Sequence, residues 1–385
     1  MSFGEAGKVV EQVPPSAPAG PAFESAKQLF LEGLAALKAG RLEDAERAFV
    51  ASLEAVPGRA STLLNLGTTR LRMHRPVEAI AAADAVLAVE PGDVDALGIR
   101  AIALARMGLQ EQALAAYDRL VAAEPRLATM WSQRGSLLRE MGRLDEAKAS
   151  YAEAQARGDD SALTDYFLAG VAGGTPPPAA PPDYVEGLFD DYAAEFDAHL
   201  VGVLGYQGHT LLAGNLPEPE RHFASTLDLG CGTGLCGPLL KPRTDRLTGI
   251  DLAAGMLDRA RALGVYDRLE RAEAVAWLKA NTETFDLIVS ADVLVYIGDL
   301  DGLFAGVRRA LARGGVFGFS IELAASGDDG PPFALQPSLR YTHSARYIRE
   351  LAARHGFTIV RAVQAAMRED RREAVDGIYF YLTTA

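Results

Sequence analysis

The sequence has little cysteine, no long apolar run and no excess of basic residues. Its two cysteines, Cys231 and Cys236, lie five positions apart, which excludes a scaffold built on disulfides. No apolar run reaches the roughly 18 residues that a membrane helix needs. The first residues also lack the basic stretch and apolar core of a secretory signal. These absences predict a cytoplasmic protein with no membrane partner.

The charge balance argues against binding to nucleic acid. The 385 residues carry 38 Lys and Arg against 51 Asp and Glu, a net charge of −13. Nucleic-acid binding relies on basic surface that releases the counterions of phosphates. The group Arg308, Arg309 and Arg313 is more typical of a solvated helix face than of a basic patch. We therefore expect no nucleic-acid complex. A length of 385 residues predicts two or three domains, and a hydrophobic fraction of 49% excludes disorder of the whole chain.

The first half contains an internal repeat. Residues 1–24 mix Gly, Pro, Ser and Ala without periodicity and are predicted to be a disordered tail. Alanine then recurs every 34 residues, at Ala45, Ala79, Ala113 and Ala147. Proline follows the same step, at Pro57, Pro91 and Pro125. This period indicates antiparallel helix pairs, in which small residues allow close approach and proline ends the second helix.

The period resembles that of the tetratricopeptide repeat (TPR). Residues 25–161 fit four units, which span 26–59, 60–93, 94–127 and 128–161. Stacked units expose a concave groove, which predicts a protein partner. Apolar residues such as Leu34 and Ile99 favour an apolar groove over a carboxylate clamp, although packing on neighbouring helices explains them equally well. The oligomeric state does not follow from the sequence.

The second half alternates strand-like and helix-like segments. Residues 162–183, rich in Pro and Gly, are predicted to be an extended linker to a domain at 184–385. Apolar β-rich runs occur at 224–229, 246–251, 285–290, 314–321, 356–362 and 376–383. Such alternation predicts a mostly parallel sheet covered by helices on both faces, with ligands at the carboxyl ends of the strands.

A glycine-rich loop follows the first of these strands. The segment reads Leu-Asp-Leu-Gly-Cys-Gly-Thr-Gly over 227–234, and its glycines allow a ligand to approach the backbone. The second strand ends in Asp251, whose carboxylate can accept hydrogen bonds from both hydroxyls of a ribose. The alternative for Asp251 is a helix N-cap. Asp228 beside the loop suits a cationic group better than a pyrophosphate, so we predict a nucleoside-bearing cofactor other than NAD.

Three segments, LDLGCGTG, GIDLAAGML and FDLIVSADVLVYIGDL, resemble those of class I S-adenosylmethionine-dependent methyltransferases. With its repeats, the chain is similar to a bacterial family of predicted methyltransferases that carry N-terminal TPR repeats. Residues 188–200 and 340–344 also look like that family. The resemblance implies an all-α TPR solenoid followed by an α/β Rossmann-like domain. That domain would hold a seven-stranded, mostly parallel sheet with a final antiparallel strand.

The resemblance also implies a site for S-adenosylmethionine. The implied cofactor-binding residues are Asp228, Gly230, Cys231, Gly232, Thr233, Gly234, Asp251, Leu252, Met256, Glu273, Asp292 and Tyr192. The glycine loop would surround the methionine part, Asp251 would hold the ribose, and Leu252, Met256 and Glu273 would surround the adenine. Asp292 would face the methyl group and the substrate, and Tyr192 would belong to a helix that covers the cofactor. For Met256 and Tyr192, core packing is the alternative, and for Asp292 a capping role.

Methyl transfer needs a general base only if the acceptor arrives protonated. The candidate bases are His199, Tyr206, Tyr296, Tyr341 and His343, and the sequence does not choose among them. No set of Cys and His at metal-binding spacing is present, so no metal is expected. The segment 291–294 lacks an Asn-Pro-Pro-Tyr-like motif, which argues against methylation of nucleobases. We therefore predict methyl transfer to O or N of a small molecule. The alternatives are a protein substrate recruited through the TPR groove, an inactive scaffold and an NAD(P)-dependent oxidoreductase.

Overall fold

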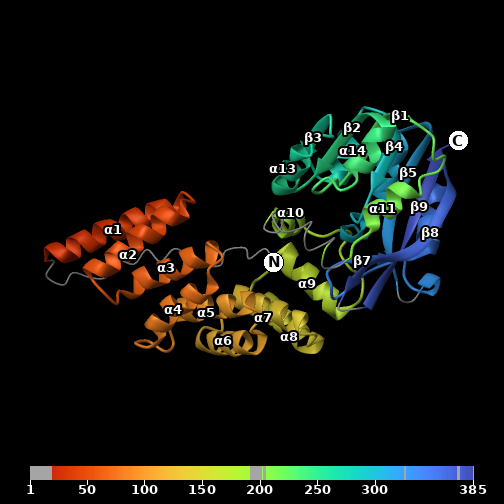
Figure 1. The fold of residues 1–385 in the computed structure, drawn as a ribbon. Coiled ribbons are helices and arrows are strands. Elements are labelled where there is room, and N and C mark those ends of the chain that lie inside the picture. The colour runs from red at the N-terminus through yellow and green to blue at the C-terminus, as the bar shows by residue number, and fades with distance from the viewer. Residues whose placement is uncertain (1–19, 191–201, 203–204, 325–326, 371–372, 385) are drawn as a thin grey trace. The chain divides into compact units, whose positions relative to one another are not determined.

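The computed structural model describes residues 20–190, 202, 205–324, 327–370 and 373–384. The chain divides into two compact units, and the boundary between them lies at 164–165. None of the helices in these ranges combines the length and the apolar composition that crossing a bilayer requires. Each unit is described separately below (Figure 1).

The first unit is built from consecutive helix pairs. Its helices are α1 (Pro21–Lys38), α2 (Leu42–Ala55), α3 (Ala60–Arg72), α4 (Pro76–Leu87), α5 (Val94–Arg106), α6 (Gln110–Ala123), α7 (Ala128–Glu140) and α8 (Leu144–Ala156). In the first and the fourth pair, a glycine of one helix faces an aromatic ring of the other. A Cβ on Gly33 would lie 2.6 Å from the ring of Phe49, and one on Gly135 would lie 2.8 Å from that of Tyr151. The two helices of a pair therefore approach closely only because the residue facing the ring has no side chain.

Neighbouring pairs are joined by arginines near the ends of their first helices. Arg72 at the end of α3 donates to the carbonyl of Leu37 in α1, at 3.2 Å. Arg106 at the end of α5 donates in the same way to the carbonyl of Leu71 in α3. A cation placed there gives the carbonyl a donor in addition to its backbone N–H and balances the negative end of the helix dipole. The same contact therefore recurs between successive helix pairs, one repeat period apart.

Helix α9 (Ala162–Ala172) occupies the first half of the segment expected to be an extended linker. The Tyr166 hydroxyl of α9 donates to the carbonyl of Leu339 at 2.7 Å, and Tyr341 donates to the carbonyl of Pro177 at 2.7 Å. Both tyrosine rings are fully buried with Ala180 in one apolar cluster. The prediction of an extended linker over 162–183 is wrong for residues 162–172, which form a helix whose Tyr166 packs into the second unit.

The second unit contains a nine-stranded sheet within the described residues. Its strands are β1 (Phe223–Leu229), β2 (Thr244–Asp251), β3 (Arg268–Arg271), β4 (Phe285–Ser290), β5 (Leu311–Leu323), β6 (Phe333–Leu335), β7 (Tyr341–His343), β8 (Phe357–Asp370) and β9 (Glu373–Thr384). The order is β3-β2-β1-β4-β5-β7-β6, and β9 pairs antiparallel with both β5 and β8. The predicted mostly parallel sheet and its final antiparallel strand are confirmed. The number of strands differs from the seven expected, because β6 and β7 are too short to show a periodic pattern.

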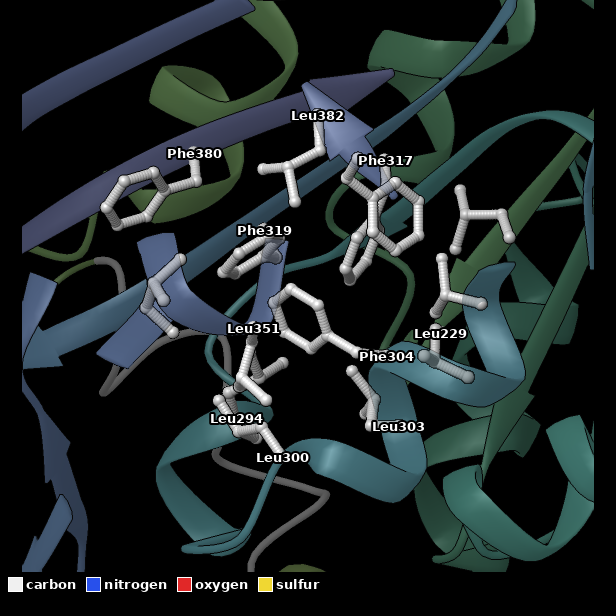
Figure 2. Packing of buried hydrophobic residues seen from close by; sticks show 14 of the residues in the cluster. Leu229, Leu294, Leu300, Leu303, Phe304, Phe317, Phe319, Leu351, Phe380 and Leu382 are labelled. Atoms are coloured by element: carbon white, nitrogen blue, oxygen red, sulfur yellow. The ribbon is translucent and has the colours of Figure 1, made fainter. Parts of the chain in front are cut away.

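Helices cover this sheet, and an aromatic core lies between helix α15 and strand β5. They are α10 (Pro182–Asp190), α11 (Gly208–Gly214), α12 (Gly237–Leu240), α13 (Ala254–Ala262), α14 (Ala274–Ala280), α15 (Asp301–Ala310) and α16 (Ala345–Arg354). Figure 2 shows Phe304 of α15 directed at Phe317 and Phe319 of β5. The Phe304 and Phe319 rings meet edge to face with centroids 5.6 Å apart, an arrangement that aromatic quadrupoles favour. This packing fixes the strands whose carboxyl ends carry the site.

Candidate cofactor and acceptor site

The loop after β1 requires glycine for two separate reasons. Gly230, Gly232 and Gly234 have φ values of +75°, +55° and +92°, in the region that side chains disfavour. A Cβ on Gly230 would also overlap Cγ2 of Val293, which follows β4. At Gly232, by contrast, no atom of the described residues comes within 4 Å of a Cβ position. The backbone at Gly232 is thus open to a ligand, while Gly230 packs against the neighbouring loop.

Asp251 joins this loop to the end of β2. Its Oδ2 accepts from the N–H of Gly232 at 2.8 Å, and its Oδ1 accepts from the N–H of Ala253 at 2.9 Å. The parallel register of β1 and β2, with Leu229 opposite Ile250, brings the two loops together. Burial raises the pKa of Asp251, while the backbone N–H donors oppose that shift. The N-cap of α13 is Ala253, so Asp251 does not occupy the capping position that was its alternative role.

Asp228 lies beneath the loop. Its Oδ2 accepts from the Tyr266 hydroxyl at 2.6 Å, and burial raises the pKa of Asp228 to about 7. Cys231 and Thr233 are buried beside it, and burial raises the pKa of the Cys231 thiol well above its usual value. Asp228 is thus a buried carboxyl group at the start of the glycine loop, held by the Tyr266 hydroxyl.

The residues expected around an adenine have other partners in the structure. Met256 is buried with Ala253, and Phe189 of α10 packs on them. The Leu252 carbonyl accepts from Arg271 at 3.1 Å. Both oxygens of Glu273 accept backbone N–H groups at the start of α14, from Val275 at 2.9 Å and from Ala276 at 2.6 Å. Glu273 thus caps a helix, a role that the sequence analysis did not assign to it.

Helix α10 lies against the cofactor loops. Asp190 at its end accepts from the N–H of Gly255 at 2.8 Å, and Glu186 pairs with Arg271. The Phe189 ring meets the Tyr296 ring edge to face at 5.6 Å. Two of the predicted site residues, Tyr192 and His199, lie outside the described residues.

Asp292 follows β4 and anchors a buried ionic network. Its φ is +61°, and its N–H donates to the Ser320 hydroxyl at 3.0 Å. Arg340 donates to Asp292 at 2.6 Å, to Glu322 at 2.7 Å and to the Tyr296 hydroxyl at 3.0 Å. Arg368 forms a second ion pair with Glu322. We call the set Asp292, Tyr296, Glu322, Arg340 and Arg368 the acceptor-side cluster.

The four candidate bases that the structure describes fall into two groups, one near Asp292 and one away from it. Tyr296 belongs to the acceptor-side cluster, and Tyr206 lies close enough that burial and the charge of Asp292 both raise its pKa. His343 is buried elsewhere, and its Nε2 donates to the carbonyls of Ile297 and Gly298 at 2.9 and 3.2 Å. Burial lowers the pKa of His343 to about 4, so the ring is neutral. With Tyr341 bound to Pro177, these two residues support the fold rather than the acceptor side.

Sequence patterns predict no site role for Arg340, Glu322 or Arg368. Arg340 did carry a signal, because it begins the segment 340–344 that resembles the methyltransferase family. Glu322 and Arg368 carried none, since they come from β5 and β8 and meet only when the sheet forms.

Comparison with known proteins supports a methyltransferase domain preceded by tetratricopeptide repeats. A family described as methyltransferase domain matches residues 227–317, and one described as tetratricopeptide repeat matches 128–157. Nodulation protein S of Rhizobium tropici is 34% identical over 130 residues, which cover 28% of this chain and 52% of that protein. Malonyl-[acyl-carrier protein] O-methyltransferase of Geobacter sulfurreducens is 34% identical over 144 residues, which cover 36% and 52%. The chain thus spans about half the length of the curated relatives it matches.

Among solved structures, an S-adenosylmethionine-dependent methyltransferase from Clostridium acetobutylicum aligns with a TM-score of 0.39 at 19% identity. The alignment covers 51% of this chain and 99% of that one. Residues 227–317 of the second unit match a methyltransferase domain, and residues 128–157, which precede that unit, match a TPR. The resemblance drawn from the sequence is thereby confirmed.

S-adenosylmethionine is the cofactor of this class, and the described residues fit it. The open backbone at Gly232 leaves room for a ligand against the loop. The carboxylate of Asp251 stands at the adjacent strand end, where it can accept ribose hydroxyls while it keeps its backbone partners. Both features lie at the carboxyl edge of the sheet, where open α/β sheets bind their ligands.

Proposed function

We propose that this chain transfers a methyl group from S-adenosylmethionine to an oxygen or nitrogen atom of a small molecule. The hydrogen bond from Gly232 to Asp251 is the observation that carries the proposal, since it couples the glycine loop to the carboxylate that we expect to bind the ribose. The TPR array would bind a protein partner, because stacked repeats present a concave surface. A protein substrate recruited by that array is the second candidate, and the repeat match at 128–157 is what favours it.

When bound, the cofactor supplies an electrophilic methyl group on a sulfonium. The chain's own residues would orient the reaction. The loop 230–234 and Asp251 would hold the nucleoside and methionine parts, and Asp292 would face the acceptor. Holding two reactants in line can lower a barrier by about 7–11 kcal/mol. Most of the work expected of this site is therefore positioning and exclusion of water.

Isothermal titration of the full chain with S-adenosylmethionine tests the proposal. We expect micromolar binding, no binding of NAD⁺, and a loss of about tenfold or more in Asp251→Ala, because a charge-assisted hydrogen bond contributes about 1.5–3 kcal/mol. Asp258→Ala is the matched control, since Asp258 is exposed on the neighbouring helix α13 and pairs with Arg261. Absence of S-adenosylmethionine binding by folded protein would overturn the proposal.

A further inference from the structure

Helix α10 lies against the segment 252–256, which directly follows Asp251 in the chain. Its Phe189 packs on Ala253 and Met256 of that segment. None of the nine residues of α10, all of which the structure describes, is buried. The position of this helix therefore depends on a few specific contacts, because burial of its side chains contributes little.

Two acids on one face of α10 make its polar contacts with this segment. Glu186 and Asp190 are four residues apart, so they lie on the same side of the helix. Asp190 accepts from the N–H of Gly255 at 2.8 Å, and Glu186 pairs with Arg271. Arg271 in turn donates to the carbonyl of Leu252 at 3.1 Å. The two acids thus hold the segment near both of its ends, one directly and the other through an arginine.

In the described structure, helix α13 begins without a side-chain cap of its own. Its N-cap is Ala253, whose side chain has no hydrogen-bond acceptor. The first N–H groups of a helix lack partners within the helix, and a carboxylate placed there satisfies one of them and the positive end of the helix dipole. Asp190 supplies this carboxylate to Gly255 from 65 positions away in the sequence. The start of α13 is therefore held by a residue outside the segment 227–317 that matches the methyltransferase domain.

The same helix start orients Asp251. The Asp251 carboxylate accepts from the N–H of Ala253 at 2.9 Å and from that of Gly232 at 2.8 Å. A displaced helix start would move the first of these donors and turn the carboxylate away from the glycine loop. Burial raises the pKa of Asp251, and the nearby charge of Asp190 adds to that rise. Two carboxylates thus share one helix N-terminus, and the geometry of one depends on the other.

We propose that Asp190 is a positioning residue of the cofactor site, which holds the start of α13 and thereby keeps the Asp251 carboxylate oriented to accept the ribose hydroxyls. The proposal rests on the proposed function, since it concerns the same S-adenosylmethionine site. Glu186 and Phe189 assist by keeping α10 in place. The affinity of the site for the nucleoside then depends on a helix that precedes the sheet in sequence.

Calorimetric titration of the full chain with S-adenosylhomocysteine tests this role. Asp190→Ala removes the acceptor of the Gly255 N–H, and we expect its affinity at neutral pH to fall about fivefold or more, the loss typical of a removed helix cap. Asp183→Ala, which removes an exposed acid from the other end of α10, should bind like wild type. Hydrogen exchange of a peptide that contains Gly255 should become faster in Asp190→Ala and stay unchanged in Asp183→Ala.

The pH dependence of binding distinguishes orientation of the carboxylate from general support of the fold. Binding should weaken on acidification as Asp251 becomes protonated. Asp190→Asn keeps an oxygen acceptor but removes the charge, so the pKa of Asp251 should fall and the weakening should begin at lower pH than in wild type. Asp228 and Cys231 also interact with the charge of Asp251, and both are the same in the two proteins.

The outcomes separate the role of Asp190 from the proposed function. If folded wild-type protein does not bind S-adenosylhomocysteine, the proposed function fails and the role of Asp190 fails with it. If wild type binds this compound and Asp190→Ala binds it as tightly, only the role of Asp190 is overturned. An equal loss in Asp183→Ala, or an unchanged pH profile in Asp190→Asn, would also overturn it, since α10 would then support the fold without orienting one carboxylate.

Discussion

Replacing Gly230 with alanine should destabilise the α/β unit more than the same change at Gly232. Both glycines have positive φ, +75° and +55°. A left-handed conformation costs a non-glycine residue about 1–2 kcal/mol. At Gly230 the new Cβ also overlaps Val293, and overpacking of this kind costs about 1–3 kcal/mol. We therefore expect a loss of about 2–5 kcal/mol for Gly230→Ala and of about 1–2 kcal/mol for Gly232→Ala.

Urea unfolding measured by tryptophan fluorescence can follow this unit by itself. The chain has two tryptophans, Trp131 in the TPR helices and Trp277 in α14. In a Trp131→Phe background, Trp277 reports the α/β unit. The collision is isolated by repeating Gly230→Ala in a Val293→Ala background, where its cost should fall to about 1–2 kcal/mol.

Two outcomes would refute this reasoning. Equal losses for Gly230→Ala and Gly232→Ala would show that the close approach to Val293 has no energetic consequence. An unchanged cost of Gly230→Ala in the Val293→Ala background would show that the loss comes from elsewhere in the loop.

Three further predictions concern stability. Phe304→Ala should cost about 3–5 kcal/mol in urea unfolding followed at Trp277, because its buried ring packs on two phenylalanines of β5, and a loss below about 1 kcal/mol would contradict that packing. Asp93→Ala should cost about 0.5–2 kcal/mol in the transition reported by Trp131, since Asp93 accepts the N–H of Ala96 at 2.7 Å and caps α5; the transition reported by Trp277 should not move. His343 has its pKa lowered to about 4 from 6.5, so between these pH values the unfolded chain binds a proton that the folded chain does not. Its contribution to stability should fall by about 1.4 kcal/mol per pH unit on acidification from 6.5 toward 4, and the difference between wild type and His343→Gln, measured by urea titration across that range, would show no slope if the ring were exposed.

Spacing predicted the repeats and the glycine loop, and the resemblance of three short segments to a known family predicted the methyltransferase domain. The 34-residue period required no partner from elsewhere, because each helix pair contacts mainly its neighbours. The glycine loop and Asp251 follow consecutive parallel strands, and strand ends meet at one edge of a sheet. Such features can be predicted from sequence because the residues concerned lie within one loop and at one strand end. Glu273 shows the limit, since its capping contacts depend on where α14 begins.

Only the tertiary structure decided what surrounds Asp292. Arg340, in the segment before β7, pairs with Asp292. Glu322 of β5 pairs with Arg340, and Arg368 of β8 pairs with Glu322, so all three join the network from distant parts of the sequence. Each is unremarkable by itself, because an isolated charged residue in a sequence is most often solvated. The sequence therefore determined that a cofactor loop exists and where the repeats lie. The charge balance around Asp292 depends on pairings between distant strands that no local pattern records.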